Sequence, residues 1–75
     1  MKSKSYIRKH VIICTHISLV KAGKYEVARL LLHLLREGKV NLGLDDASYE
    51  AENILEKVGC PYSYGRNYNT VTFRI

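Results

Sequence analysis

The chain has 75 residues and a formal net charge of +5, with 47% hydrophobic residues, one Pro and five Gly. This length leaves room for one domain, residues 1–75, and the composition is that of a folding chain rather than of a disordered tail. A pI near 9.4 favours salt-sensitive association with polyanions or anionic surfaces. Because a single core of this size gives marginal stability, the sequence also favours a homodimer.

Positive and negative side chains are separated along the chain. Residues 1–24 contain six basic groups and no acid, whereas residues 45–58 contain five acids and, as their only base, Lys57. We therefore expect a polarised molecule, whose positive part and negative helix bind different partners or bind each other between subunits.

The apolar residues near the N-terminus do not form a membrane span. The runs 11–14 and 17–20 are interrupted by Thr15 and His16 and closed by Lys21, whereas a span requires about 20 consecutive apolar residues. We expect a cytoplasmic protein with no membrane partner.

Residues 6–15 are rich in β-branched and aromatic side chains, and a helical wheel scatters their polar side chains around all sides. These features favour a strand that is buried on both faces. A helix is the alternative, because short apolar runs are ambiguous by periodicity alone.

Residues 24–37 have a clear helical period. Five apolar side chains recur on one side: Val27, Leu30, Leu31, Leu34 and Leu35. Four charged or polar side chains recur on the other: Glu26, Arg29, His33 and Arg36. Gly38 is expected to end this helix. Ala28 and Leu32 widen its apolar face, so the helix is expected at the centre of the core or shared with a second subunit.

Residues 39–44 alternate between polar and apolar and predict a short strand. Asp45 or Asp46 is the expected N-cap of a second helix, which Gly59 and Pro61 end. The expected buried face of this helix consists of Ala47, Ala51, Ile54, Leu55 and Val58.

The C-terminal residues predict a β-hairpin, with strands at 62–64 and 68–75 and a turn at 65–67. Val71, Phe73 and Ile75 are expected to face inward. The fold class is therefore α+β, with two main helices packed on a small, mostly antiparallel sheet that ends in this hairpin. The strands and helices are expected in the order β-α-β-α-β-β, which is similar to that of Alba-type chromatin proteins.

No set of side chains predicts catalysis, a cofactor or a metal. Cys14 and His16 would share one face of a strand with His10, but a third orienting group or a fourth metal ligand is missing from the pattern. Cys14 and Cys60 are interpreted as small buried residues, with a disulfide left open. We predict a protein without enzymatic activity or a small-molecule substrate; an enzyme using Cys14 or His16 is the least favoured alternative.

Residues 46–75 resemble the end of a winged helix-turn-helix domain. The resemblance is carried by the run 54–59, by the flanking segments 62–64 and 70–75, and by the polar tip 65–67. It implies that the helix at 46–58 enters the DNA major groove and that the wing around Arg66 contacts the flanking backbone or minor groove. The acids of that helix depart from the pattern, because they would repel phosphates. DNA contact is therefore expected from the wing, the basic N-terminus and the Arg29/His33/Arg36 face.

The favoured function is nucleic-acid binding, with DNA preferred over RNA and a regulatory role in transcription. The predicted contacts are Lys2, Lys4, Arg8, Lys9, Arg29, Arg36, Arg66, Asn67 and Tyr68. The alternative is a non-catalytic assembly module that uses the Leu-rich helix 24–37 and the acidic helix 45–58 as contact surfaces.

Overall fold

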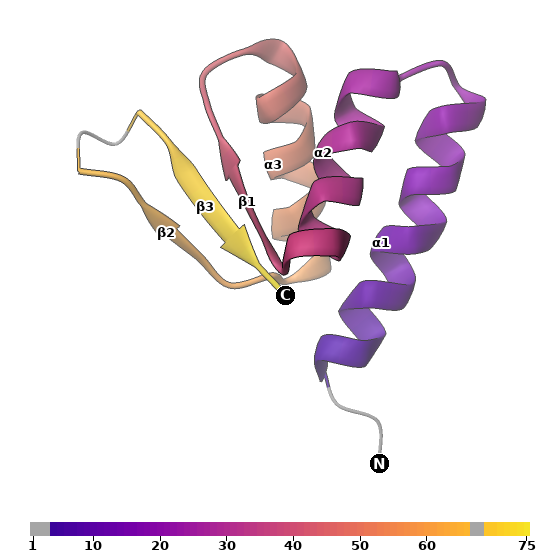
Figure 1. Cartoon of the computed structure of the whole chain (residues 1–75), viewed down its shortest axis with the longest axis horizontal. Helices are drawn as coiled ribbons and strands as arrows, with labels where there is room; N and C mark the ends of the chain where they lie inside the picture. Colours follow the sequence, from indigo (N-terminus) through magenta and orange to yellow (C-terminus); the bar gives the residue numbers. More distant parts are fainter. Residues whose placement is uncertain (1–3, 67–68) are drawn as a thin grey trace.

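A computed structural model describes residues 4–66 and 69–75. Within these residues the elements follow in the order α1 (Lys4–Lys21), α2 (Tyr25–Glu37), β1 (Lys39–Leu42), α3 (Asp46–Val58), β2 (Tyr62–Tyr64) and β3 (Val71–Arg74). The strands form an antiparallel sheet in the order β1-β3-β2. Figure 1 shows α1 at one end, the β2–β3 hairpin at the other, and α2 between α1 and the sheet. The predicted α+β class is confirmed.

The first element corrects the sequence prediction. Residues 6–15 belong to a helix and not to a strand, so the order β-α-β-α-β-β is wrong and three helices pack where two were expected. Ile12 and Leu19 are buried, and their spacing of seven residues puts them on one face of a helix. The Thr15 hydroxyl donates to the Val11 carbonyl at 2.9 Å, a bond that accommodates a β-branched residue in a helix.

α2 and α3 end where the sequence predicts. Gly38 and Gly59 follow the two helices with φ angles of 82° and 91°, a left-handed conformation that suits glycine. Asp45 occupies the N-cap position of α3, although its side chain makes no capping hydrogen bond. The Gly43 N–H instead donates to the Ser48 hydroxyl at 3.1 Å, which ties the β1–α3 loop to the first turn of α3.

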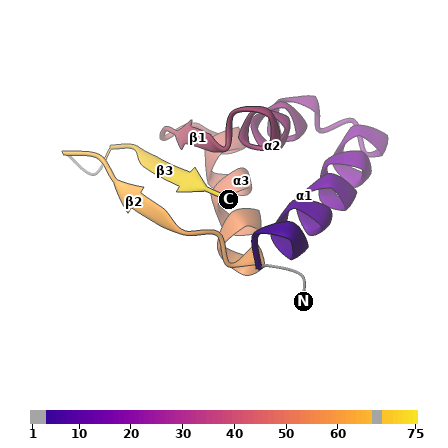
Figure 2. The same cartoon turned by 60° about the horizontal axis from the view of Figure 1, so that its bottom comes forward.

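The core lies between the three helices and one face of the sheet. Six large side chains are fully buried: Ile12, Leu31, Leu34, Leu42, Leu55 and Phe73. Phe73 of the central strand contacts Tyr62, with ring centroids 5.3 Å apart. Figure 2 shows that α1 and the hairpin lie on opposite sides of α3.

Two neighbouring leucines of α2 provide a matched test of this packing. Leu31 is 0% exposed and Leu32 is 38% exposed. We expect Leu31→Ala to lower the free energy of unfolding by about 2–5 kcal/mol, because it leaves a cavity. Leu32→Ala should lower it by no more than about 1 kcal/mol. Urea denaturation followed by circular dichroism measures both, and equal losses would contradict the burial of Leu31.

Candidate functional site

The outward face of the sheet carries cationic and hydrogen-bonding side chains. Lys39 and Asn41 of β1 lie opposite Arg74 and Thr72 of β3, and Ser63 of β2 lies opposite Thr72. Alternate positions in the strands turn apolar side chains toward the helices. None of the three strands contains a carboxylate. The outward face therefore offers donors and positive charge to a ligand, with no negative charge of its own.

The pairing of Lys39 with Arg74 brings two cations together. The two residues are direct cross-strand partners, and both are exposed. Side chains at such positions have Cβ atoms about 4.5–5.5 Å apart, and like charges there are destabilising. Among residues 4–66 and 69–75 the ion pair joins Lys24 to Glu50, so neither Lys39 nor Arg74 takes part in it. No ion pair among the described residues neutralises this local excess of positive charge.

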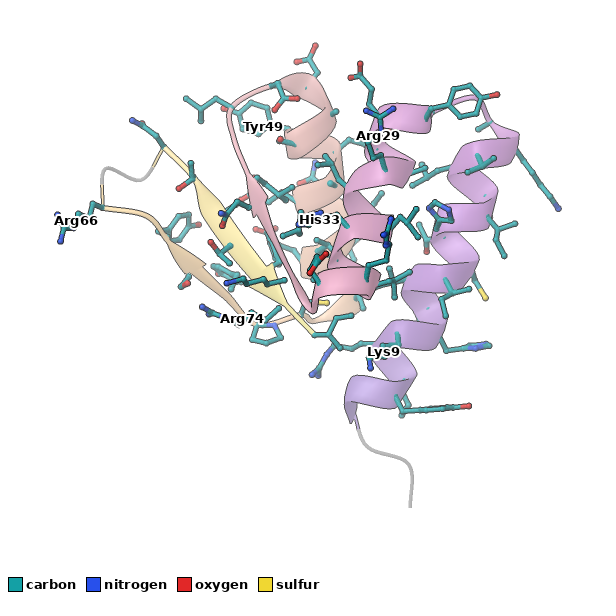
Figure 3. All side chains as sticks on the ribbon, viewed as in Figure 1. Lys9, Arg29, His33, Tyr49, Arg66 and Arg74 are labelled. Atoms are coloured by element: carbon teal, nitrogen blue, oxygen red, sulfur yellow. The ribbon has the colours of Figure 1, made fainter. Side chains whose placement is uncertain are left out.

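The solvent-facing side of α2 continues this positive surface. Arg29, His33 and Arg36 are exposed on the side opposite the buried Val27, Leu31 and Leu34. In Figure 3 Arg29 and His33 lie along the solvent-facing side of α2, and Arg74 lies on the neighbouring sheet. Only Gly38 and Glu37 separate Arg36 from Lys39 in the sequence, so the two surfaces adjoin where α2 ends.

α1 adds one cation from the N-terminal part of the chain. The His16 Nδ1–H donates to the Ala28 carbonyl at 2.8 Å, which fixes how α1 lies beside α2. Because the two helices run in opposite directions (Figure 1), Lys9 lies level with the C-terminal end of α2. Figure 3 shows Lys9 and Arg74 toward the same end of the molecule.

We call this surface the basic face, and it consists of Lys9, Arg29, His33, Arg36, Lys39 and Arg74. Two acids of α2 lie beside these cations: Glu37 lines a shallow pocket with Arg29, His33 and Arg36, and Glu26 lines another with Arg29. Side chains from α1, α2, β1 and β3 thus contribute to one surface, although they are far apart in the sequence.

The structure separates the contacts that the sequence predicted. Lys9, Arg29 and Arg36 belong to the basic face, whereas Arg66 lies at the tip of the hairpin, far from Lys9 (Figure 3). Arg8 is half-buried, and its Nε is buried without a hydrogen-bond partner. Lys2, Asn67 and Tyr68 lie outside the described residues, as does the side chain of Lys4.

Sequence reasoning missed Lys39 and Arg74 as site residues. The alternation of residues 70–75 already predicts that Arg74 faces outward, and the polar-apolar alternation from 39 to 44 indicates the same for Lys39. The missing information was the pairing of β1 with β3, which no local pattern specifies.

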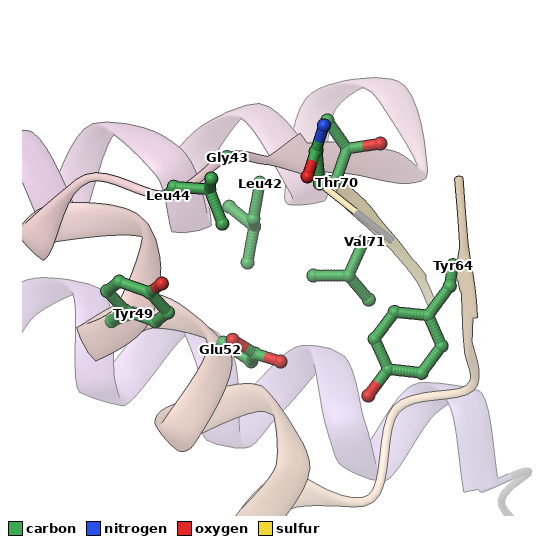
Figure 4. A pocket seen from close by; sticks show the side chains of 9 residues that line it. Leu42, Gly43, Leu44, Tyr49, Glu52, Tyr64, Thr70 and Val71 are labelled. Atoms are coloured by element: carbon green, nitrogen blue, oxygen red, sulfur yellow. The ribbon is translucent and has the colours of Figure 1, made fainter. Parts of the chain in front are cut away.

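The opposite charge gathers around α3. Asp45, Asp46, Glu52 and Glu56 lie on this helix or at its start, and Glu50 is held by Lys24. A pocket of about 210 Å³ lies between α3 and the hairpin, where Tyr49, Glu52 and Tyr64 surround apolar residues (Figure 4). Desolvation, the Tyr62 phenol and the carboxylates of Glu52 and Glu56 raise the pKa of Tyr64. This negative environment repels phosphate.

The thiols and imidazoles do not form the constellation considered from sequence. On helix α1, Cys14 faces His10, with 3.9 Å between Sγ and Nε2, while His16 bonds to α2. Cys14 is exposed, which corrects its interpretation as a buried residue; Cys60 is buried, and both are free. The described residues contain no group of three or more side chains that would hold a metal ion.

No protein-family model matches the chain, and no curated protein or solved structure was found to be significantly similar. Within the ranges that the structure describes, no helix has both the length and the apolar character that crossing a membrane requires.

The two cysteines are expected to differ in reactivity. Burial raises the pKa of Cys60 above its ordinary value of 9.0, against a smaller opposing effect of the Arg8 charge. Because the thiolate is the nucleophile, iodoacetamide should alkylate Cys14 in the native protein and Cys60 only after denaturation. Mass spectrometry of digested protein reads both sites. Rapid native alkylation of Cys60 would contradict its burial.

The repulsion between Lys39 and Arg74 predicts a stabilising substitution. Arg74→Gln should raise the free energy of unfolding at low ionic strength by a few tenths of a kcal/mol, up to about 1 kcal/mol. The gain should disappear near 1 M salt, where the Debye length is about 3 Å. Arg66→Gln is the control, because Arg66 lies in the hairpin connection and has no cross-strand partner. A destabilised Arg74→Gln protein at low salt would contradict the repulsion.

Proposed function

We propose that this protein binds nucleic acid, with DNA favoured over RNA, through the basic face. The observation that carries the proposal is the Lys39–Arg74 pair, two facing cations with no carboxylate beside them in the sheet. A nucleic acid supplies closely spaced phosphates, whose charge would relieve this repulsion and release counterions. A cytoplasmic location and a role in transcription, both expected from the sequence, belong to the same proposal.

Neighbouring polar groups support phosphate binding at the same place. Thr72 donates its hydroxyl hydrogen to Asn41 Oδ1, so the amide N–H groups of Asn41 remain as donors toward a ligand. Ser63 is exposed on the edge strand beside Thr72. Guanidinium groups such as Arg74 bind phosphate through two parallel hydrogen bonds. These contacts are sequence-independent and position the protein on the phosphate backbone.

The distribution of charge favours this surface over the acidic helix α3. A groove-entering α3 would bring Glu52 and Glu56 toward phosphates, and the repulsion would oppose binding. The hairpin extends the proposed contact in the manner of a wing, with Arg66 at its tip. This role of the hairpin is what the resemblance to winged helix-turn-helix domains implies. Asn67 and Tyr68, named from sequence as contacts, belong to the same proposal.

Salt-dependent binding of duplex DNA tests the proposal. Affinity should fall steeply between about 50 mM and about 200 mM salt. The double variant Lys39→Gln/Arg74→Gln removes two phosphate contacts, so the slope of log affinity against log salt should decrease by about 2. Fluorescence anisotropy with a labelled duplex and with a labelled RNA of the same sequence measures affinity, slope and the preference for DNA.

A control variant separates the basic face from total charge. Lys21→Gln/Lys57→Gln removes the same two charges from positions outside the basic face and should keep the wild-type slope. Binding that ignores salt, or an equal loss in both double variants, would contradict the proposal.

A further inference from the structure

The outward side of α1 exposes an unusual amount of apolar surface. Twelve large hydrophobic side chains are exposed among the described residues, and half of them lie on α1: Tyr6, Ile7, Val11, Ile13, Ile17 and Val20. Exposed apolar patches of this kind mark interaction sites in small soluble domains. The sequence predicted that the helix at 24–37 lies at the centre of the core or is shared with a second subunit, and the burial of Leu31 and Leu34 confirms the first alternative.

The exposed residues follow the spacing of a coiled coil. His10, Ile13, Ile17 and Val20 are separated by three, four and three residues, which is the repeat of a and d positions in a heptad. Ile13 and Ile17 are 45% and 48% exposed, and they point away from the buried Ile12 and Leu19, at least about 100° from each around the helix. We call His10, Ile13, Ile17 and Val20 the α1 seam.

Among the described residues, no other helix or strand covers the α1 seam. α1 packs against α2 and, more lightly, against α3, both of which lie on its inner side. Figures 1 and 2 both show α1 at the edge of the molecule, with its outer side free along its length. An 18-residue helix is about 27 Å long, so another helix has room to lie along the whole seam.

We infer that two copies of this chain associate through the α1 seam as an antiparallel helix pair. A second α1 carries the same heptad spacing, and a two-fold contact uses one self-complementary surface twice. In the antiparallel register Ile13 meets the partner's Ile17, and His10 meets the partner's Val20. Two Ile13–Ile17 layers then form the apolar centre of the seam, and a His10–Val20 layer closes it at each end.

Charge selects the antiparallel direction. α1 contains no acid, and three of its four cations, Lys4, Arg8 and Lys9, lie in its N-terminal half, with Lys21 at its C-terminal end. A parallel pair would place these cations and the positive ends of two helix dipoles side by side. The antiparallel pair puts them at opposite ends. Because only one helix of each copy takes part, we expect a contact at the weak end of specific interfaces and a dissociation constant in the micromolar range.

Cross-linking of the exposed Cys14 can distinguish an antiparallel from a parallel pair of α1 helices. Cys14 follows Ile13 on one flank of the α1 seam, and in an antiparallel pair the same flanks of both helices face each other. The two Cys14 thiols then lie on one side of the pair, close to its two-fold axis. In a parallel pair they lie on opposite sides. A short bis-maleimide linker should therefore join Cys14 to the partner's Cys14, while Cys60 is buried.

Sedimentation in the absence of nucleic acid tests the inference. Between about 1 μM and about 200 μM, a range that covers micromolar dissociation constants, the wild-type mass should rise from 8.6 kDa to twice that value. Ile13→Lys/Ile17→Lys should remain monomeric with an unchanged circular dichroism spectrum. Leu44→Lys/Tyr49→Lys adds the same charges at exposed residues away from α1 and should dimerise as the wild type does.

Three results would overturn the inference. These are a wild-type monomer over the whole range, a dimer that persists in the folded Ile13→Lys/Ile17→Lys variant, and a wild-type dimer in which the linker fails to join the Cys14 thiols. The last measurement uses the wild-type chain, so it decides the question even when the lysine variant does not fold. Because the α1 seam and the basic face share no residue, either proposal can fail without the other.

Discussion

The antiparallel pairing of β1 with β3 is the interaction on which the rest of the structure depends. Four residue pairs, from Lys39–Arg74 to Leu42–Val71, join a strand between two helices to the last strand of the chain. The pairing turns Val40 and Phe73 into one apolar surface against α2 and α3. The same register sets Lys39 opposite Arg74 on the outside. The core and the sheet part of the basic face thus lie on the two sides of the β1–β3 pair. A shift of one strand by one residue would turn its apolar side chains outward and its polar side chains inward.

The charges are separated between surfaces rather than neutralised. Most carboxylates lie on α3 or at its start, and cations outnumber the acids Glu26 and Glu37 on the face of α2, β1 and β3. Lys24–Glu50 is the ion pair that the described residues form. A single carboxylate on β2 or in the hairpin would already reduce the repulsion between Lys39 and Arg74. The arrangement instead keeps a repulsion in a domain whose total stability is small, which is why we attribute it to ligand binding rather than to folding.

The sequence predicts the parts of this fold that local patterns determine. The heptad-like leucines of α2, the glycines after α2 and α3 and the alternation of residues 70–75 fix those elements correctly. Residues 6–15 were predicted wrongly because their β-branched composition suggests a strand, while their state is decided by the packing of Ile12 and Leu19 against α2. Of the residues in the basic face, Lys9, Arg29 and Arg36 were named from the sequence because of their charge. Lys39 and Arg74 were not, because strand pairing is a long-range property.

The two proposed surfaces have a geometric relation that follows from α1 itself. Lys9 immediately precedes His10, so it lies on the flank of the α1 seam opposite Cys14, and this flank faces α2. In an antiparallel pair the two-fold axis is perpendicular to the plane of the two helices, so equivalent flanks point to the same side. Both copies of Lys9, and the basic faces that they adjoin, would then point to one side of the dimer. Two adjacent cationic surfaces engage one polyanion with a higher effective affinity than one surface does. A small domain with few phosphate contacts would in this way bind nucleic acid firmly only at concentrations at which α1 finds a second copy.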